Sequence, residues 1–124
     1  MADDYQAARP IYMQIVDKVL LQVARKELMP GQKLPSVREM AIDSGVNPNT
    51  IQRTYSELER MQLVETKRGQ GTFITVEKEI IAELRERLQF EVVDQFIKKM
   101  KDLGLTEKEI THQLTAYLKE KEGE

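Results

Sequence analysis

The sequence predicts a mainly α-helical chain with one small β-hairpin, an α+β fold followed by a separate pair of helices. Three stretches with helical signals precede two short β-like runs, and the helical period then returns for the rest of the chain. A chain of 124 residues suffices for one ordinary domain or two small ones. We expect two domains, residues 1–76 and residues 77–124.

Composition narrows the class of protein. The chain is 40% hydrophobic and 32% charged, which is typical of a globular protein. It holds no apolar run long enough to span a membrane, and its N-terminus, MADDYQAARP, lacks the basic start and apolar stretch of a signal peptide. The absence of cysteine excludes disulfides, zinc–thiolate sites and a thiol nucleophile. We therefore expect a cytoplasmic protein.

The first helix is expected from Pro10 to about Glu27. Proline suits the first turn of a helix, because the amide that it lacks would be unpaired there. The apolar residues that follow recur mostly at three- and four-residue steps: Ile11, Ile15, Val19, Leu20 and Val23. The segment MPGQKLP, with two prolines and a glycine, then ends the helix.

Two further helices are predicted by their start and stop signals. Ser36 and Glu39 form an S-x-x-E capping box, in which each side chain caps the other residue's free backbone amide. Gly45 ends this short helix, whose inward residues we expect to be Val37, Met40 and Ala41. Asn47 and Pro48 start the next helix as cap and first helical residue. Its buried residues are expected to be Ile51, Tyr55, Leu58 and Met61.

A hairpin and two helices complete the chain. The runs LVETK and TFITV are joined by RGQG, and two glycines between such runs indicate a hairpin. Three helices followed by a two-stranded wing make a winged helix-turn-helix. From Glu77 the helical period returns for roughly 25 residues, and Gly104 ends it. Thr106 and Glu109 form a second capping box, which starts a last helix before a frayed tail, EKEGE.

The helix that begins at Pro48 carries the main functional signal. At about 100° per residue, its apolar residues fall on one side, and the opposite side presents Asn49, Arg53, Ser56 and Arg60, with Thr50 and Gln52 on the flanks. Arginine pairs with guanine, and asparagine or glutamine with adenine. No acidic residue occurs from Asn47 to Ser56 in a chain that has 21 of them, which favours an anionic partner. A merely solvated polar face is the alternative.

Two other elements add basic residues. Arg38 lies in the first turn of its helix, where a cation opposes the helix dipole, and contact with DNA would explain it. An ion pair with Asp43 or a neighbouring acid is the alternative. In the hairpin, the residues that can grip phosphate or approach DNA closely are Lys67, Arg68, Gly69, Gln70, Gly71 and Thr72. We therefore predict binding to double-stranded DNA.

Four segments closely resemble the N-terminal domain of GntR-family bacterial transcription regulators: PIYMQIVDKV, PGQKLPSVREMA, GVNPNTIQRTYSELE and RGQGTFI. The resemblance covers about residues 10–76, and the short helical tail resembles the YtrA-type branch. It implies operator contacts by Arg38, Asn47, Asn49, Thr50, Arg53, Gly69, Gln70 and Gly71. Many family members have arginine where this chain has Pro48 and Gln52, so their base preference does not transfer. We expect a repressor, and the branch implies control of an ABC-type transporter operon.

The last two helices predict a homodimer. Two helices alone form too small a core, and the long one has an apolar stripe wider than one partner helix needs. The residues expected at the dimer contact are Ile81, Leu84, Leu88, Val92, Phe96 and Met100. Packing of these helices on the winged domain is the alternative. A dimer implies an operator of two inverted half-sites. The tail is too short for a dedicated effector domain, although a small ligand between protomers stays open.

Other classes of function have less support in the sequence. The formal net charge of −2 and a pI of about 5.6 favour, as the alternative, a winged helix that binds a protein and no DNA. The charge is uneven, with ten basic and nine acidic residues in 1–76 against nine and twelve in 77–124. No nucleophile–base pair or nucleotide loop is visible, so we do not expect an enzyme or a cofactor. His112 is the only histidine and cannot build a transition-metal site with Glu109 alone.

Overall fold

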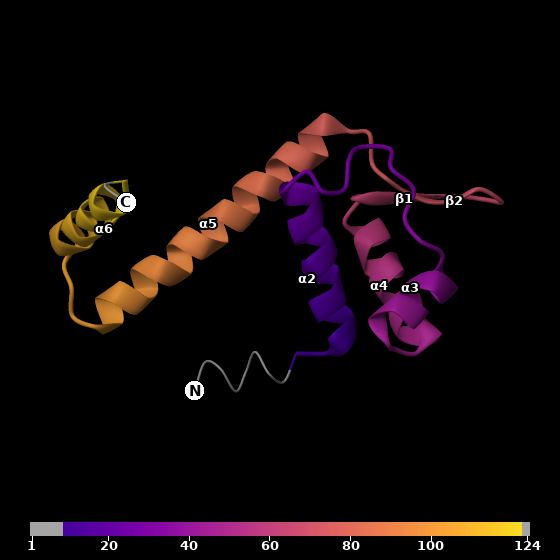
Figure 1. Ribbon diagram of the computed structural model, residues 1–124, viewed down its shortest axis with the longest axis horizontal. Coiled ribbons are helices and arrows are strands. Elements are labelled where there is room, and N and C mark those ends of the chain that lie inside the picture. The colour runs from indigo at the N-terminus through magenta and orange to yellow at the C-terminus, as the bar shows by residue number, and fades with distance from the viewer. Residues whose placement is uncertain (1–8, 123–124) are drawn as a thin grey trace. The chain divides into compact units, whose positions relative to one another are not determined.

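The computed structural model describes residues 9–122, which form five helices and one two-stranded antiparallel sheet (Figure 1). In chain order these are α2 (Ile11–Ala24), α3 (Val37–Ser44), α4 (Pro48–Arg60), β1 (Val64–Lys67), β2 (Gly71–Ile74), α5 (Lys78–Asp102) and α6 (Glu107–Glu122). The predicted mainly α fold with a small hairpin is confirmed. None of the helices in this described range is long and apolar enough to cross a membrane. The expectation about a signal peptide concerns residues 1–8, which lie outside that range.

The chain divides into two compact units, an N-terminal unit that ends at Arg85 and a C-terminal unit that starts at Glu86. The division falls within α5, whereas the sequence pattern places it after residue 76, at the end of the wing. The assignment of these regions as a DNA-binding and a dimerisation domain stays a prediction.

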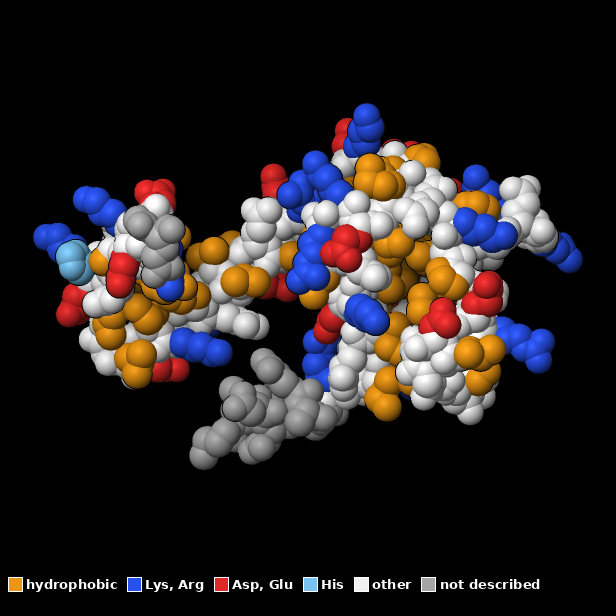
Figure 2. Space-filling view, in the orientation of Figure 1, with side chains coloured by type: hydrophobic (Ala, Val, Ile, Leu, Met, Phe, Trp, Pro, Cys, Tyr) orange, Lys and Arg blue, Asp and Glu red, His pale blue; other side chains and the backbone are white. Residues whose placement is uncertain are grey.

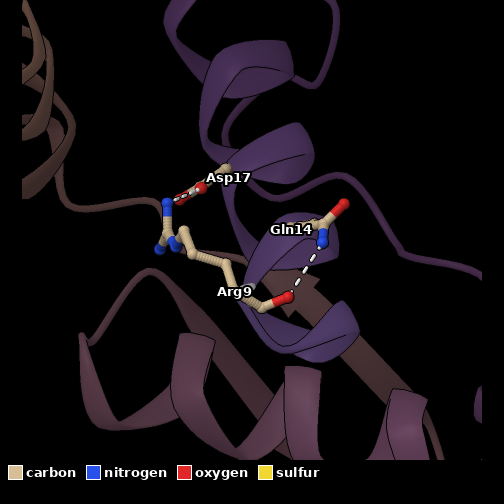
Figure 3. Close-up of polar contacts among 3 residues, drawn as sticks. All are labelled: Arg9, Gln14 and Asp17. Atoms are coloured by element: carbon tan, nitrogen blue, oxygen red, sulfur yellow. Dashed lines mark hydrogen bonds and ion pairs between the residues drawn. The ribbon is translucent and has the colours of Figure 1, made fainter. Parts of the chain in front are cut away.

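The chain is fixed just before α2 by contacts of Arg9 (Figure 3). The guanidinium of Arg9 pairs with the carboxylate of Asp17, and the amide of Gln14 donates to the carbonyl oxygen of Arg9 at 3.0 Å. Pro10 has ψ 144° and its carbonyl oxygen accepts from the backbone amide of Gln14 at 3.3 Å. Pro10 is therefore the N-cap of α2, one position earlier than the first helical position that was predicted.

The C-terminal end of α2 is also earlier than predicted. The helix ends at Ala24 rather than near Glu27, because Lys26 has a φ of +66° that no α-helix allows. Its buried residues are Val16, Val19, Leu20 and Val23. Ile11, which was expected on this face, is 58% exposed, since it lies at the start of the helix beyond the core.

The helix-turn-helix forms as its capping signals predict. The hydroxyl of Ser36 accepts from the amide of Glu39 at 3.1 Å, and the carboxylate of Glu39 accepts from the amide of Ser36 at 3.0 Å. Gly45 ends α3 with a φ of +67°, a conformation that glycine adopts without a steric penalty. The side-chain oxygen of Asn47 then accepts from the amide of Asn49 at 2.8 Å, with Pro48 at the first helical position. These caps fix where each helix starts.

The wing is wider than the two predicted strands. Its register pairs Lys67 with Gly71 and Val64 with Ile74, so the strands are β1 and β2 while Thr75 and Val76 fall outside. The segment 31–34 pairs with the other edge of β2: the amide of Leu34 donates to the carbonyl of Thr72 at 2.8 Å, and that of Ile74 to the carbonyl of Gln32 at 2.8 Å. The sequence pattern treated this segment only as a break. Leu34 is 3% exposed and belongs to the core.

In the N-terminal unit, α4 packs on α2, α3 and β1 (Figure 1). Three of the four residues predicted for the buried side of α4, Ile51, Tyr55 and Leu58, are buried, while Met61 is half-buried at the C-cap. Thr54 is fully buried and was not expected to be. Its hydroxyl lies 2.9 Å from the carbonyl oxygen of Thr50 and 3.2 Å from that of Tyr12, which links α4 to α2.

In the C-terminal unit, the end of α5 is followed by α6. Helix α5 has 25 residues, as the spacing predicts, and Gly104 follows it with a φ of +88°. Thr106 and Glu109 form the expected capping box, with bonds of 2.9 and 3.2 Å. Residues 120–122 continue α6, so this part of the tail predicted to fray is helical, and residues 123–124 lie outside the described range.

Candidate nucleic-acid interface

The outer side of α4 presents polar residues, as its helical spacing predicts. Asn49, Gln52, Arg53 and Ser56 are exposed, and Thr50 is half-buried. Arg60 is exposed but pairs with Glu57, whose pKa is lowered mainly by the hydrogen bond from the Arg60 guanidinium. The side-chain oxygen of Asn47 is occupied by the cap, which leaves its amide group to donate to a ligand. Apart from the hydroxyl of Ser56, the exposed donors of α4 that lack an acidic partner therefore lie in its first two turns.

Arg53 is held by an aromatic side chain from another helix. Its guanidinium carbon lies 4.2 Å from the centroid of the Tyr12 ring, in the first turn of α2. At this distance the ring face attracts the cation. Tyr12 was not singled out from the sequence, because Arg53 follows it by about forty residues and nothing local joins the two. The predicted reader of a base thus contacts a side chain of α2.

Arg38 projects from α3 without an acidic partner. It is exposed, and no described acid, Asp43 included, forms an ion pair with it. The alternative of a pair with Asp43 is therefore not what the structure shows. The start of α3 is tied to α4, because the hydroxyl of Tyr55 donates to the carbonyl oxygen of Pro35 at 2.6 Å. Arg38 and the first turns of α4 thus belong to one fixed pair of helices.

The turn of the wing depends on glycine. The amide of Gln70 donates to the carbonyl oxygen of Lys67 at 2.9 Å, and Gly69 has a φ of +78° at the third position of this turn. That combination is typical of a type II turn, which requires glycine or asparagine there. Arg68, Gly69 and Gln70 are all exposed at the tip.

The two faces of the wing differ. Opposite residues of paired strands point to the same side, so Lys67, Gly71 and Phe73 share one face with Glu65. The ammonium of Lys67 lies 5.1 Å from the centroid of the Phe73 ring. The other face carries Thr72, whose hydroxyl lies 3.3 Å from that of Thr66. Thr72, predicted as a DNA-contacting residue, therefore lies on the side opposite to Lys67.

Lys33 is a further basic residue of the wing that the sequence pattern missed. It forms a bridge with Phe73 across the added edge. Its side chain crosses Gly71, since a Cβ atom at Gly71 would lie 2.7 Å from Cε of Lys33. A side chain at this position would displace that of Lys33, and the φ of +122° at Gly71 also favours glycine. Lys33 and Lys67 thus flank Gly71 and Phe73 on one face.

The residues predicted for dimer contact differ in their exposure to solvent. Leu84 is 4% exposed and already buried within the chain, and Ile81, Leu88 and Met100 are half-buried. Val92 and Phe96 are exposed. The other large hydrophobic residues exposed in the C-terminal unit are Phe90, Val93, Leu103, Leu114, Tyr117 and Leu118. Of these, Phe90 was missed, because it lies nine residues after Ile81 and hence about 180° around the helix.

Helices α5 and α6 leave most of each other's large apolar residues uncovered. No Cα atom of α6 lies within 8 Å of a Cα atom of α5 in the described chain, and Ile110 is the one residue of α6 that is buried there. Figure 2 shows hydrophobic side chains gathered on the part of the surface formed by α6. Exposed apolar residues gathered in one region often mark a contact with another protein.

Glu109 and His112 line an open depression at the start of α6. The carboxylate of Glu109 is already engaged by the capping box, and the backbone amide of Thr106 is the main cause that lowers its pKa. Among residues 9–122, no three side chains that could ligate a metal come together.

The comparisons with known proteins agree with this geometry. Residues 11–74 match the family model described as "Bacterial regulatory proteins, gntR family". The chain is 58% identical over 110 residues to the HTH-type transcriptional regulator YhcF of Bacillus subtilis. The matched stretch covers 89% of this chain and 91% of that protein. It is 44% identical over 72 residues to the HTH-type transcriptional repressor YtrA of the same organism. Those residues cover 58% of this chain and 55% of YtrA.

Solved structures show the same fold. A GntR-family regulator from Listeria monocytogenes has a TM-score of 0.82 and 36% identity, over 88% of this chain and 96% of that one. The DNA-binding domain of AraR, solved with operator ORX1, has a TM-score of 0.54 and 26% identity, over 56% of this chain and 84% of that one. These relatives are regulators of transcription rather than enzymes. The chain belongs to the GntR family of bacterial regulatory proteins and is a transcriptional regulator with a winged helix-turn-helix DNA-binding domain.

Proposed function

We propose that the chain is a repressor that binds an inverted-repeat operator as a homodimer. The observation that carries the proposal is the exposed, acid-free start of α4 beside the unpaired Arg38. Major-groove readers place the first turns of the second helix of the motif against base edges. Donors in these turns meet that requirement.

Each part of the surface has its own role in the proposal. Asn49, Gln52 and Arg53 contact base edges, since their side chains offer the donors and acceptors that guanine and adenine present. Arg38, Asn47 and Thr50 bind phosphate or the nearest bases. In the wing, Lys67 and Arg68 bind phosphate together with Lys33, and the backbone of Gly69, Gln70 and Gly71 approaches the groove.

The second copy of the chain is proposed to cover the exposed apolar side chains of the C-terminal unit. Val92, Phe96 and Tyr117 are 68%, 36% and 59% exposed, and α6 leaves them uncovered. Burial against an identical surface removes them from water on both protomers. The paired units would then hold two copies of α4 against two half-sites in inverted order.

The regulatory assignment rests on relatives. YtrA is named as a repressor, and the resemblance to its branch supports repression of an ABC-type transporter operon. A regulator that binds operator DNA in a bacterium works in the cytoplasm, where we place this one.

Selection of bound sequences from a random DNA pool tests the proposal. We expect the selected sequences to share two inverted half-sites, and the complex to weaken as salt concentration rises. Arg53→Ala should cost about 1–3 kcal/mol of binding free energy and relax the preference at one base pair per half-site. Arg25→Ala, at the exposed C-cap of α2, is the matched control and should leave selection unchanged. Absence of any enriched sequence at low salt would leave the alternative, a winged helix that binds only protein.

A further inference from the structure

Tyr12 connects α2 to the surface of α4 through two independent contacts. Its carbonyl oxygen lies 3.2 Å from the hydroxyl of Thr54, a side chain that is fully buried. Its ring lies under the guanidinium of Arg53, with 4.2 Å between the ring centroid and Cζ. Thr54 and Arg53 are neighbours on α4. The backbone of Tyr12 is thus fixed to the same turn of α4 that carries the arginine.

The position of the ring decides how Arg53 can act. A free arginine side chain loses conformational entropy when it is ordered against a ligand. A guanidinium that lies on an aromatic face is ordered beforehand, and its N–H groups point outward in its own plane. Those are the groups that bind the O6 and N7 atoms of guanine. The ring therefore contacts the guanidinium of Arg53, whose N–H groups form no hydrogen bond with another described residue.

We propose that Tyr12 is a positioning residue for base recognition: its ring holds Arg53 in the orientation that reads the operator, and Tyr12 itself reads no base. This proposal rests on the proposed DNA-binding function. It assigns a role in specificity to α2, a helix outside the helix-turn-helix. No other described aromatic ring lies over Arg53.

A double-mutant cycle in the full chain tests it. Tyr12→Leu removes the ring and keeps an apolar side chain, so it should weaken operator binding about two- to five-fold, the factor that corresponds to an exposed cation–π contact. In an Arg53→Ala background the same change should have no effect, because the group that Tyr12 positions is gone. Tyr12→Phe keeps the ring and should bind as the parent does. Met13→Leu, at the neighbouring half-buried position of α2, is the matched control and should also bind normally.

Three results would overturn the proposal. An equal loss from Tyr12→Leu in both backgrounds would mean that Tyr12 acts through folding or through its own DNA contact. A loss with Tyr12→Phe would mean that the phenol hydroxyl binds DNA. A gain with Tyr12→Leu would mean that the ring competes with the operator for Arg53. If Tyr12→Leu does not fold, Tyr12→Met provides the same cycle with a second aliphatic side chain.

A measurement without DNA separates this inference from the function on which it rests. The ring current of Tyr12 should shift the Arg53 side-chain proton resonances upfield in the free protein, and Tyr12→Leu should abolish that shift. Absence of the shift in the parent overturns the positioning role even if the operator is bound. Presence of the shift in a protein that selects no DNA overturns the proposed function and leaves the contact in place, without a base to read.

Discussion

Tyr55→Phe tests whether the bond between α4 and the start of α3 stabilises the helix-turn-helix. Tyr55 is 5% exposed, and its hydroxyl donates to the carbonyl oxygen of Pro35 at 2.6 Å. Loss of a hydrogen bond costs about 0.5–1.5 kcal/mol net, and a buried acceptor left without a donor costs about 1–3 kcal/mol. Pro35 is only half-buried, so water can partly replace the donor. We expect the free energy of unfolding to fall by about 1–2 kcal/mol.

Urea unfolding followed by circular dichroism measures this change, with parent and variant compared at one protein concentration because association shifts apparent stability. Tyr117→Phe makes the same chemical change at a residue of α6 that is 59% exposed. It should alter the free energy of unfolding by less than about 0.5 kcal/mol. Equal effects of the two substitutions would refute the idea that the Tyr55 hydroxyl stabilises this pair of helices.

The effect of pH provides an independent check. Burial, together with the nearby charge of Glu39, raises the pKa of Tyr55 to about 12 from an ordinary value of 10. Above pH 10 the unfolded chain therefore loses this proton before the folded chain does, and stability falls as pH rises from 10 towards 12. Phenylalanine has no such proton. The stability difference between the parent and Tyr55→Phe should consequently shrink over that range, and a constant difference would contradict the buried, neutral tyrosine.

Three further predictions follow from single contacts. Lys33→Ala should weaken binding to all DNA sequences alike and reduce the slope of log K against log salt concentration by about 0.9 per protomer. The control Lys119→Ala, on α6, should change neither the affinity nor this slope. Equal slopes for the two variants would show that Lys33 does not contact DNA. A Val92→Ser and Tyr117→Ser double variant should shift sedimentation equilibrium towards monomer while the circular dichroism spectrum stays the same, and an unchanged dimer would place the contact elsewhere. Gly45→Ala should lower the free energy of unfolding by about 1–2 kcal/mol, because Gly45 has a φ of +67° that strains a residue with a side chain. An added Cβ would meet no other atom within 4 Å, so this strain is the only cost expected. An unchanged free energy of unfolding would mean that the turn relaxes.

Local signals in the sequence predicted the element boundaries that depend on caps. Ser36 with Glu39 and Thr106 with Glu109 form capping boxes within four residues, so the sequence contains both partners of each bond. Gly45 and Gly104 end helices for an equally local reason. The end of α2 was predicted too late because no proline or glycine occurs between Pro10 and Pro30, while Lys26 already leaves the helical region.

The features that the sequence did not reveal depend on residues that are far apart along the chain. Leu34 pairs with Thr72, and Lys33 crosses Gly71, only after the hairpin has folded back on segment 31–34. The stack of Arg53 on Tyr12 requires α2 and α4 to pack first. A polar face on one helix was therefore predictable from spacing, whereas its supporting residues were not.

The acidic pI favours a protein partner when only the sequence is considered. The positions of the acidic side chains in the structure change this interpretation. Near α4, Glu39 caps α3, Glu57 pairs with Arg60, and Glu59 accepts from the hydroxyl of Thr66 at 2.9 Å. None of these carboxylates lies on the first two turns of α4, so the start of this helix is free of acid although the chain carries a net charge of −2. Non-specific attraction to DNA depends on the overall charge, but a base contact depends on its immediate surroundings. We therefore expect weak binding to unrelated DNA beside strong binding to the operator, so that added salt abolishes the former well before the latter. A complex that is equally strong on any sequence would contradict this separation of overall charge from local recognition.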